Sequence, residues 1–514
     1  MAAVVAAAAA TRLVGLGDRP MHHDESLDAW FSWQVWRGEP YRYDPVYHGP
    51  LRFYLTSGIY SVLGVADASA RLLAALAGTA TVALCGATRR WIGDVGSIAA
   101  AALMAISPTM LYFSRFGRED SLMGLLELGL LVAVLSWLTA PRWWHPALVG
   151  TLAAMAFATK ETMFIVAAVT GSYLLGFLAW DRWRARRAGP APRAVVLEAL
   201  RSPGWRGWTA GIAAFALAFA ALFSVGFSDL GGIGAGAFDG IDYWLSQQPV
   251  NRGSMPPGFY AVLLCAYELP IVVLAVVGGW SVVRRRDPVL GLVAWTAAAN
   301  LAVYSWASER FPWLLVHPLI PMVLLAGLAV QRWSERPAAD RPRWVWAAAA
   351  VGAVVLAATA ARVVYVQPSD PRELLAAVQS SDQVPAVRDR VLAAAEGRPA
   401  DDPLRVVVDS SSSGAWPWSW YLRDLDAAYV DLAVDPAAAA DADVVLVDAA
   451  NLALLPAEVQ AWPQTPYDLR RWWLPEWGDG SPLEWADWWA TREVFNPTGA
   501  TGSVLLERAP GSTE

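Results

Sequence analysis

The stretch Asp120–Thr139 reads DSLMGLLELGLLVAVLSWLT and is the clearest guide to the fold. Its only charged residues are Asp120 and Glu127, and its length is that of a helix crossing a bilayer. Similar apolar runs lie near residues 2–17, 67–88, 94–112, 146–159, 161–180, 208–227, 258–283, 288–306, 312–331 and 344–366. The sequence therefore predicts a membrane all-α bundle with about eleven transmembrane helices.

The composition agrees with a membrane location. Hydrophobic residues make up 56% of the chain and charged residues 17%, which is more apolar than one water-soluble core requires. The net charge of -7, with acid gathered near the C-terminus, argues against binding of nucleic acid. The two cysteines, Cys85 and Cys265, lie in apolar runs and are interpreted as buried hydrophobic side chains rather than a disulfide.

The uneven distribution of arginine predicts the orientation. The arginine-rich loops are those at 89–90, 142, 182–206, 284–286 and 332–343. By the positive-inside rule these loops are cytoplasmic, so residues 18–66, 113–119 and 228–257 and the turns near 160 and 307–311 face outward. We expect a multi-pass protein of the plasma membrane. The first run, interrupted by Arg12, could instead be a signal peptide, and both interpretations place residue 18 outside.

A change in composition after Tyr365 predicts a second domain. The chain becomes rich in Asp and Pro, and Arg405–Asp409 and Asp443–Asp448 have the pattern of short buried strands. We expect a transmembrane domain at residues 1–366 and a soluble, extracytoplasmic α/β domain at residues 367–514.

The first outer loop, residues 18–66, contains the motifs MHHDES at 21–26 and YRYDPVYHGP at 41–50. The segment 28–36 has the spacing of a helix lying in the membrane interface, and residues 51–63 could form a second one.

The adjacent Asp24 and Glu25 are candidates for a general base, because they lie near several histidines at an expected membrane boundary. The same groups could hold a divalent cation, with possible ligands His22, His23, Glu25 and Asp120. The alternative is a solvated loop start. The sequence shows no ligand spacing that decides for a metal.

The second outer loop reads YFSRFGREDS at 112–121 and brings charge to a helix start. Asp120 could cap that helix, and it could also act in a site together with Glu119. Arg115 and Arg118 are candidate contacts for an anion.

Lys160 is the only lysine of the chain and precedes Glu161 between two apolar runs. Burying either charge in a bilayer is costly, so the pair is either a neutralised structural pair or a site where Lys160 meets a phosphate.

Further outer segments offer binding groups. Glu309 and Arg310 precede a span that contains His317, which could equally be a satisfied helix residue, and Tyr47 and His48 belong to the first loop. The segments 239–244 and 247–253 are rich in hydrogen-bonding side chains that could bind a sugar. Tryptophans of the tail could stack on sugar rings or pack in a core: Trp416, Trp418, Trp420, Trp472, Trp473, Trp477, Trp485, Trp488 and Trp489.

Taken in order, these motifs resemble the GT-C class of polytopic glycosyltransferases, over most of residues 1–366. More narrowly, HHDES at 22–26, YDPVYHGP at 43–50, YFSRF at 112–116 and ERFPW at 309–313 resemble the family named flippase activity-associated, which is similar to the protein mannosyltransferases. The chain departs from this family at two positions, with Arg310 where the family has Lys and Gln248 where it has His. These differences weaken the assignment of the family's binding roles to these two residues.

The resemblance implies transfer of a sugar from a polyprenyl-phosphate donor to a glycan or protein acceptor on the outer face. Asp24 occupies the position of the catalytic acid of the wider class. The rival function is a lipid-linked-sugar flippase or its non-catalytic accessory, which would bind a headgroup without breaking a bond. An ion transporter would place charges near mid-span, and here they lie at expected helix ends.

Overall fold

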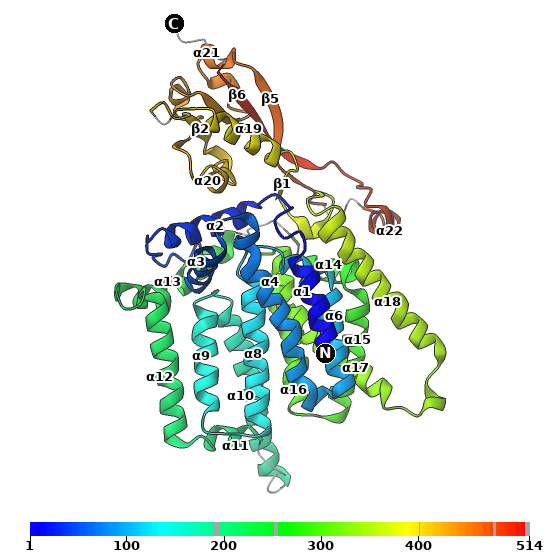
Figure 1. Cartoon of the computed structure of the whole chain (residues 1–514). Helices are drawn as coiled ribbons and strands as arrows, with labels where there is room; N and C mark the ends of the chain where they lie inside the picture. The colour runs from blue at the N-terminus through cyan, green and yellow to red at the C-terminus, as the bar shows by residue number, and fades with distance from the viewer. Residues whose placement is uncertain are drawn as a thin grey trace. The chain divides into compact units, whose positions relative to one another are not determined.

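The computed structural model describes residues 1–188, 195–250, 255–256, 258–399, 401–475, 478 and 480–508 (Figure 1). The chain divides into two compact units. The membrane unit consists of Met1–Leu16 and Gln34–Val366, and the C-terminal unit of Gly17–Trp33 and Gln367–Glu514. The C-terminal unit thus includes part of the first loop, which the sequence assigned to the transmembrane domain.

Each apolar range of the sequence contains a helix. The helices up to residue 201 are α1 (Ala2–Leu13), α2 (His23–Trp36), α3 (Leu51–Leu63), α4 (Asp67–Leu84), α5 (Arg89–Ile92), α6 (Asp94–Ile106), α7 (Pro108–Phe113), α8 (Asp120–Thr139), α9 (His145–Phe157), α10 (Met163–Ala188) and α11 (Val195–Arg201). They are followed by α12 (Gly204–Phe223), α13 (Gly231–Gln247), α14 (Phe259–Tyr267), α15 (Leu269–Arg285), α16 (Leu290–Trp306), α17 (Val316–Ser334) and α18 (Arg343–Ala361). Short helical turns are η1 (Cys85–Thr88), η2 (Gln248–Val250), η3 (Pro312–Leu315), η4 (Ala338–Asp340) and η5 (Arg362–Val366).

Fewer helices than expected have the length of a full span. Among the described residues, six helices are long and apolar enough to cross a membrane, or seven if the bent pair α14 and α15 forms one span. Helices α1, α6 and α9 are apolar but shorter. The run at 94–112 shows why hydropathy overestimates span length: Ser107 ends α6, and its side chain accepts a hydrogen bond from the Met110 N–H to start α7.

Helix α17 lies at the centre of one half of the membrane unit, in contact with α6, α15 and α16 (Figure 1). It is 94% buried over its apolar window, as expected for a helix that is hydrophobic on all sides. Gly278 of α15 permits the close approach, because a Cβ there would lie 2.0 Å from the carbonyl oxygen of Leu325. In the other half, α9 packs between α8 and α12.

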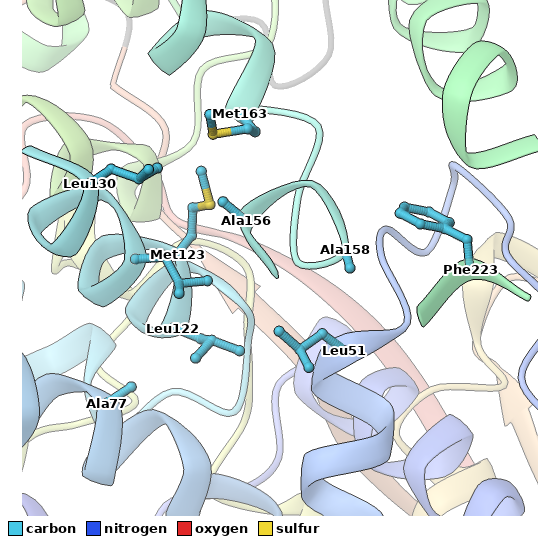
Figure 2. Close-up of a cluster of buried hydrophobic side chains, with 10 residues drawn as sticks. Leu51, Ala77, Leu122, Met123, Leu130, Ala156, Ala158, Met163 and Phe223 are labelled. Carbon is cyan, nitrogen blue, oxygen red and sulfur yellow. The ribbon is translucent and has the colours of Figure 1, made fainter. Parts of the chain in front are cut away.

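An apolar cluster fills the space between α3, α4, α8 and α9 near the start of α8. Figure 2 shows its members, which are Leu51, Ala77, Leu122, Met123, Leu126, Leu130, Ala156, Ala158, Met163 and Phe223. An apolar cluster of this kind shields neighbouring side chains from water. The shielding strengthens electrostatic interactions between charged groups.

The C-terminal unit contains a mixed six-stranded sheet of order β1-β5-β6-β4-β2-β3. Its strands are β1 (Gln379–Ser380), β2 (Val406–Asp409), β3 (Ala427–Val430), β4 (Val444–Asp448), β5 (Gln464–Trp472) and β6 (Gly499–Glu507). Its helices are α19 (Val384–Glu396), α20 (Trp418–Tyr421), α21 (Ala457–Gln460) and α22 (Pro482–Thr491), with the turns η6 (Leu374–Ala376), η7 (Ser411–Ser413), η8 (Pro436–Ala439) and η9 (Leu452–Leu454). The two strands expected from the sequence are β2 and β4, which pair in parallel.

Candidate active site

Lys160 lies at the centre of a cluster of buried charges in the membrane unit. It follows the end of α9, and its Nζ is 2.6 Å from Asp120 Oδ1 and 2.9 Å from Glu119 Oε1, at the start of α8. All three side chains are buried. The two outer segments that the sequence singled out separately, 119–120 and 160–161, are therefore brought together at one end of the bundle.

The loop before α3 adds His48 to this charged cluster. Its Nδ1 lies 2.6 Å from Glu161 Oε2, and its Nε2 lies 3.5 Å from Glu119 Oε1. The indole of Trp244 stacks parallel to the imidazole, with ring centroids 5.6 Å apart. The Tyr43 hydroxyl donates a 2.8 Å hydrogen bond to Glu161 Oε1, so that carboxylate is held from both sides.

Gly49 explains how His48 reaches Glu161. The Gly49 N–H donates to the Thr159 carbonyl and the Leu51 N–H to that of Ala158, so the loop lies directly on the end of α9. A Cβ at Gly49 would be 2.2 Å from the backbone of Ala158, which leaves room only for glycine. His48 itself has a φ of +67°, an uncommon conformation that the surrounding contacts stabilise.

Glu119 is the most strongly neutralised carboxylate of the charged cluster. Arg118 lies 2.9 Å away and Arg52 3.6 Å away, in addition to Lys160 and His48. Burial opposes ionisation of Glu119, but these cations outweigh burial and hold its pKa well below the usual range. The same balance raises the pKa of Lys160, because its two carboxylate partners outweigh burial. Both groups are therefore charged at neutral pH.

His48 should make the stability of the protein depend on pH. Burial opposes its charge, but Glu161 and Glu119 outweigh burial and raise its pKa. Because the pKa of His48 is higher in the folded than in the unfolded protein, its charge stabilises the fold. This stabilisation is complete below the pKa of the unfolded protein, about 6.5, and is lost as the pH rises through the folded pKa. We expect the difference in Tm between the natural protein and His48→Gln to be largest in acid and to shrink at alkaline pH. A difference that does not change with pH would contradict this charge assignment.

The charged cluster continues into the interior through His317. Its Nε2 lies 3.6 Å from Asp120 Oδ1, and its Nδ1 lies 2.9 Å from Glu127 Oε1. Tyr304 stacks on the imidazole. His317 and Glu127 also line one part of a cavity of about 310 Å³ whose other walls are largely apolar, including Leu130, Val134, Met163, Val166, Leu292 and Ile320.

Two arginines predicted to bind substrate are engaged with the backbone. Arg115 donates hydrogen bonds to the carbonyls of Thr11, Arg12, Val14 and Gly15, where α1 ends. Thr11 and Arg12 are among the last four residues of α1, whose carbonyls have no intrahelical partners, and Val14 and Gly15 directly follow the helix. Arg115 therefore fastens α1 in place.

Arg310 donates in the same way to the carbonyls of Ser305, Trp306 and Met255. Its neighbour Glu309 is partly exposed, as is Tyr47 beside His48. Asn251–Gly253 of the predicted sugar-binding loop and Trp477 of the tail lie outside the described residues.

In the C-terminal unit, the adjacent acids of the first loop have different surroundings. Glu25 is fully buried, accepts a 3.1 Å bond from Arg19 and caps the start of α2 by accepting from the His22 N–H. The Asp24 side chain stays 27% exposed, with one carboxylate oxygen 3.9 Å from His23 Nε2. Asp24 is thus the member of the pair whose carboxylate is accessible to solvent.

The segment that carries Asp24 is fastened to the C-terminal unit by hydrogen bonds on both sides of Met21. The Met21 N–H donates to the Tyr421 hydroxyl, and the Met21 carbonyl accepts from Ser380. Gln379 of β1 donates to the Pro20 carbonyl. Sequence reasoning missed these three residues, because partners some 360 to 400 positions away leave no local signal. It also missed Arg19, although its partner Glu25 is only six positions away.

Two of the possible metal ligands are engaged in other contacts. His22 Nδ1 accepts a hydrogen bond from the Asp24 N–H, and its Nε2 lies 3.0 Å from the Ala377 carbonyl. Glu25 is engaged by Arg19. Over the part of the chain that the structure describes, no group of three or more His, Cys, Asp or Glu side chains is arranged to hold a metal ion.

Residues 47–200 match the family described as dolichyl-phosphate-mannose-protein mannosyltransferase. No curated protein matches the chain by sequence. The solved structure of ArnT from Cupriavidus metallidurans bound to undecaprenyl phosphate is 17% identical with a TM-score of 0.56, and the match covers 91% of this chain and 95% of that chain. The archaeal oligosaccharyltransferase AglB from Archaeoglobus fulgidus, in complex with an inhibitory peptide and a dolichol-phosphate, is 12% identical with a TM-score of 0.53. That match covers 87% of this chain and 69% of the other.

The likeness to ArnT and AglB concerns the fold alone, since the sequence identities are only 17% and 12%. The family match falls on the segment that contains His48, Glu119, Asp120, Lys160 and Glu161, which is the whole centre of the charged cluster. The partial family match and the shared fold agree with the resemblance of this chain to the GT-C class of polytopic membrane glycosyltransferases.

Proposed function

We propose that this protein transfers a hexosyl group from a polyprenyl-phosphate-linked donor to an acceptor hydroxyl on the extracytoplasmic face of the plasma membrane, with Asp24 as general base. The observation that carries the proposal is the contrast within the acidic pair. Arg19 neutralises Glu25 inside the protein, whereas the Asp24 carboxylate stays partly exposed on a segment fastened by Tyr421, Ser380 and Gln379. A base must be both reachable and fixed in position.

The proposed reaction is a single displacement. The acceptor oxygen forms a bond to the anomeric carbon while Asp24 takes the proton of that hydroxyl. The bond between the anomeric carbon and the phosphate oxygen breaks, and its electron pair leaves with the polyprenyl phosphate. The configuration at the anomeric carbon inverts.

The leaving phosphate gains negative charge, which a cation can stabilise. We assign this role to Arg118 and Lys160 rather than Arg115, whose hydrogen bonds go to the end of α1. Arg118 keeps 11% of its side chain exposed and lies over the Trp313 ring, 4.9 Å from its centroid. Lys160 is more deeply buried and shared by two carboxylates, so Arg118 is the stronger candidate for direct contact.

The donor class is proposed on the likeness to two solved structures. ArnT was solved with undecaprenyl phosphate and AglB with a dolichol-phosphate, and both share the fold of this chain. The proposal gives Glu25 a positioning role, since its carboxylate holds the start of α2. His48 and Glu161 keep the charged cluster in place in the same way.

The test uses the purified protein in proteoliposomes with radiolabelled polyprenyl-phosphate hexoses, offered glycan and peptide acceptors with and without a chelator. Transfer of label to an acceptor supports the proposal. Donor binding without transfer to any acceptor would overturn it in favour of a flippase accessory. Loss of transfer in the chelator arm would show that a divalent cation takes part, and unchanged transfer would show that none is needed.

A further inference from the structure

One tryptophan of the C-terminal unit differs from its neighbours. Trp416 is partly exposed, whereas Trp418 and Trp420, two and four residues later, are buried in the core. The Trp416 ring meets the His23 imidazole edge-on, with centroids 6.3 Å apart. Because His23 directly precedes Asp24 and lies 3.9 Å from its carboxylate, the indole belongs to the surroundings of the proposed base.

The loop that carries Trp416 is held in a fixed conformation. Arg470 of β5 donates hydrogen bonds to the carbonyls of Ser413 and Trp416, and its own side chain is only 8% exposed. Ser412 and Ser413 have φ values of +51° and +60°, in the left-handed region that non-glycine residues rarely adopt. Such a conformation persists only where its surroundings enforce it, and it is commonest at functional sites.

The charge of Asp24 also acts on Arg470. Burial lowers the pKa of Arg470, and Asp24 opposes that effect. Arg470 therefore holds the loop of Trp416 by hydrogen bonds and also feels the charge of Asp24.

We propose that Trp416, with His23 at its edge, is a binding subsite for a hexopyranose ring beside Asp24, and that this ring belongs to the acceptor. One face of a pyranose presents C–H groups that can pack on an indole, and its rim presents hydroxyls that an imidazole and a carboxylate can bind. The inference rests on the proposed function, which it deepens by favouring a glycan acceptor over a bare peptide.

The acceptor is favoured over the donor for an electrostatic reason. A donor sugar arrives attached to an anionic phosphate, which the Asp24 carboxylate would repel. An acceptor sugar is neutral there and must bring its hydroxyl to the base. A sugar ring held by Trp416 next to Asp24 is therefore the one that carries the attacking hydroxyl.

The first experiment measures binding without turnover. Saturation-transfer NMR on the full-length protein in detergent uses methyl α-mannopyranoside, methyl β-glucopyranoside and methyl β-galactopyranoside as probes. We expect transfer to the ring C–H protons of at least one probe, lost in Trp416→Ala and partly kept in Trp416→Phe. The matched control is Trp489→Ala on α22, which removes another tryptophan of the same unit, 47% exposed, and should change nothing.

The second experiment separates this inference from the proposed function. In the transfer assay, Trp416→Ala should raise the apparent KM for a glycan acceptor roughly tenfold and leave the KM for the lipid donor unchanged. A higher donor KM, or an unchanged acceptor KM, would overturn the subsite while leaving the glycosyltransferase proposal intact. Sugar binding that depends on Trp416 in a protein without transfer would instead refute the proposed function and the acceptor assignment, and leave the sugar-binding subsite itself intact. Absence of binding by all three probes to the natural protein would also overturn the subsite.

Discussion

Asp24→Asn is expected to lower the rate of sugar transfer by about 10²–10⁴-fold, the contribution typical of a general base. The substitution keeps the shape and polarity of the side chain but removes its capacity to take a proton. Because Asp24 is assigned no favourable contact with the donor phosphate, donor binding should not weaken. The measurement is kcat for transfer together with the Kd of the polyprenyl-phosphate sugar.

Asp18→Asn is the matched control for this prediction. Asp18 lies six positions earlier on the same segment and is exposed. If loss of negative charge on the segment were sufficient to stop transfer, the two variants would behave alike. Equal activity of Asp24→Asn and the natural protein would remove Asp24 from the mechanism.

Lys160→Met is expected to have the largest effect on stability. It leaves the carboxylates of Glu119 and Asp120 buried next to each other without the cation they share. Breaking a buried ion pair in this way costs roughly 3–5 kcal/mol, and we expect the lower end because Arg118 remains beside Glu119. Thermal unfolding in detergent, followed by circular dichroism, measures the effect.

Two comparisons make the Lys160 prediction specific. Lys160→Arg keeps the cation and should recover part of the lost Tm. Arg42→Met removes the partner of Asp229 from an exposed ion pair at 3.9 Å and should have no measurable effect. If Lys160→Met unfolds at the same temperature as the natural protein, the charged cluster does not stabilise the bundle as described.

The sequence indicated several members of the charged cluster one by one, as candidate residues at helix ends, but not their pairing. Glu119 and Asp120 begin α8, and Lys160 follows the end of α9. Consecutive antiparallel helices bring such ends to the same side of a bundle, which the alternation of arginine-rich and arginine-poor loops already indicated. The approximate positions of the helices were predictable from the apolar runs of the sequence.

What an arginine binds was not predictable. Arg115 and Arg118 are three residues apart in one loop, yet the first donates to the carbonyls at the end of α1 and the second pairs with Glu119. A guanidinium serves either acceptor equally well, so only the three-dimensional arrangement distinguishes the two roles. Arg52, a further partner of Glu119, was overlooked because it lies inside an apolar helix.

The assignment of Asp24 to the C-terminal unit was also beyond sequence reasoning. Its segment contacts β1, a strand of two residues with no detectable pattern, and Tyr421 on a single helical turn. Long-range hydrogen bonds of this kind depend on register and loop geometry, which hydropathy does not encode. The difference between Asp24 and Glu25 arises from the position of Arg19, six residues before Glu25.

The most direct test of the central claim, a single displacement assisted by Asp24, is the configuration of the new glycosidic bond. A donor of known anomeric configuration is turned over by the natural protein, and the product is assigned from the NMR coupling constant of its anomeric proton. The account predicts inversion, because the acceptor attacks opposite the leaving phosphate. Retention would require two successive displacements through a glycosyl-enzyme intermediate and would contradict the role of Asp24 as a base.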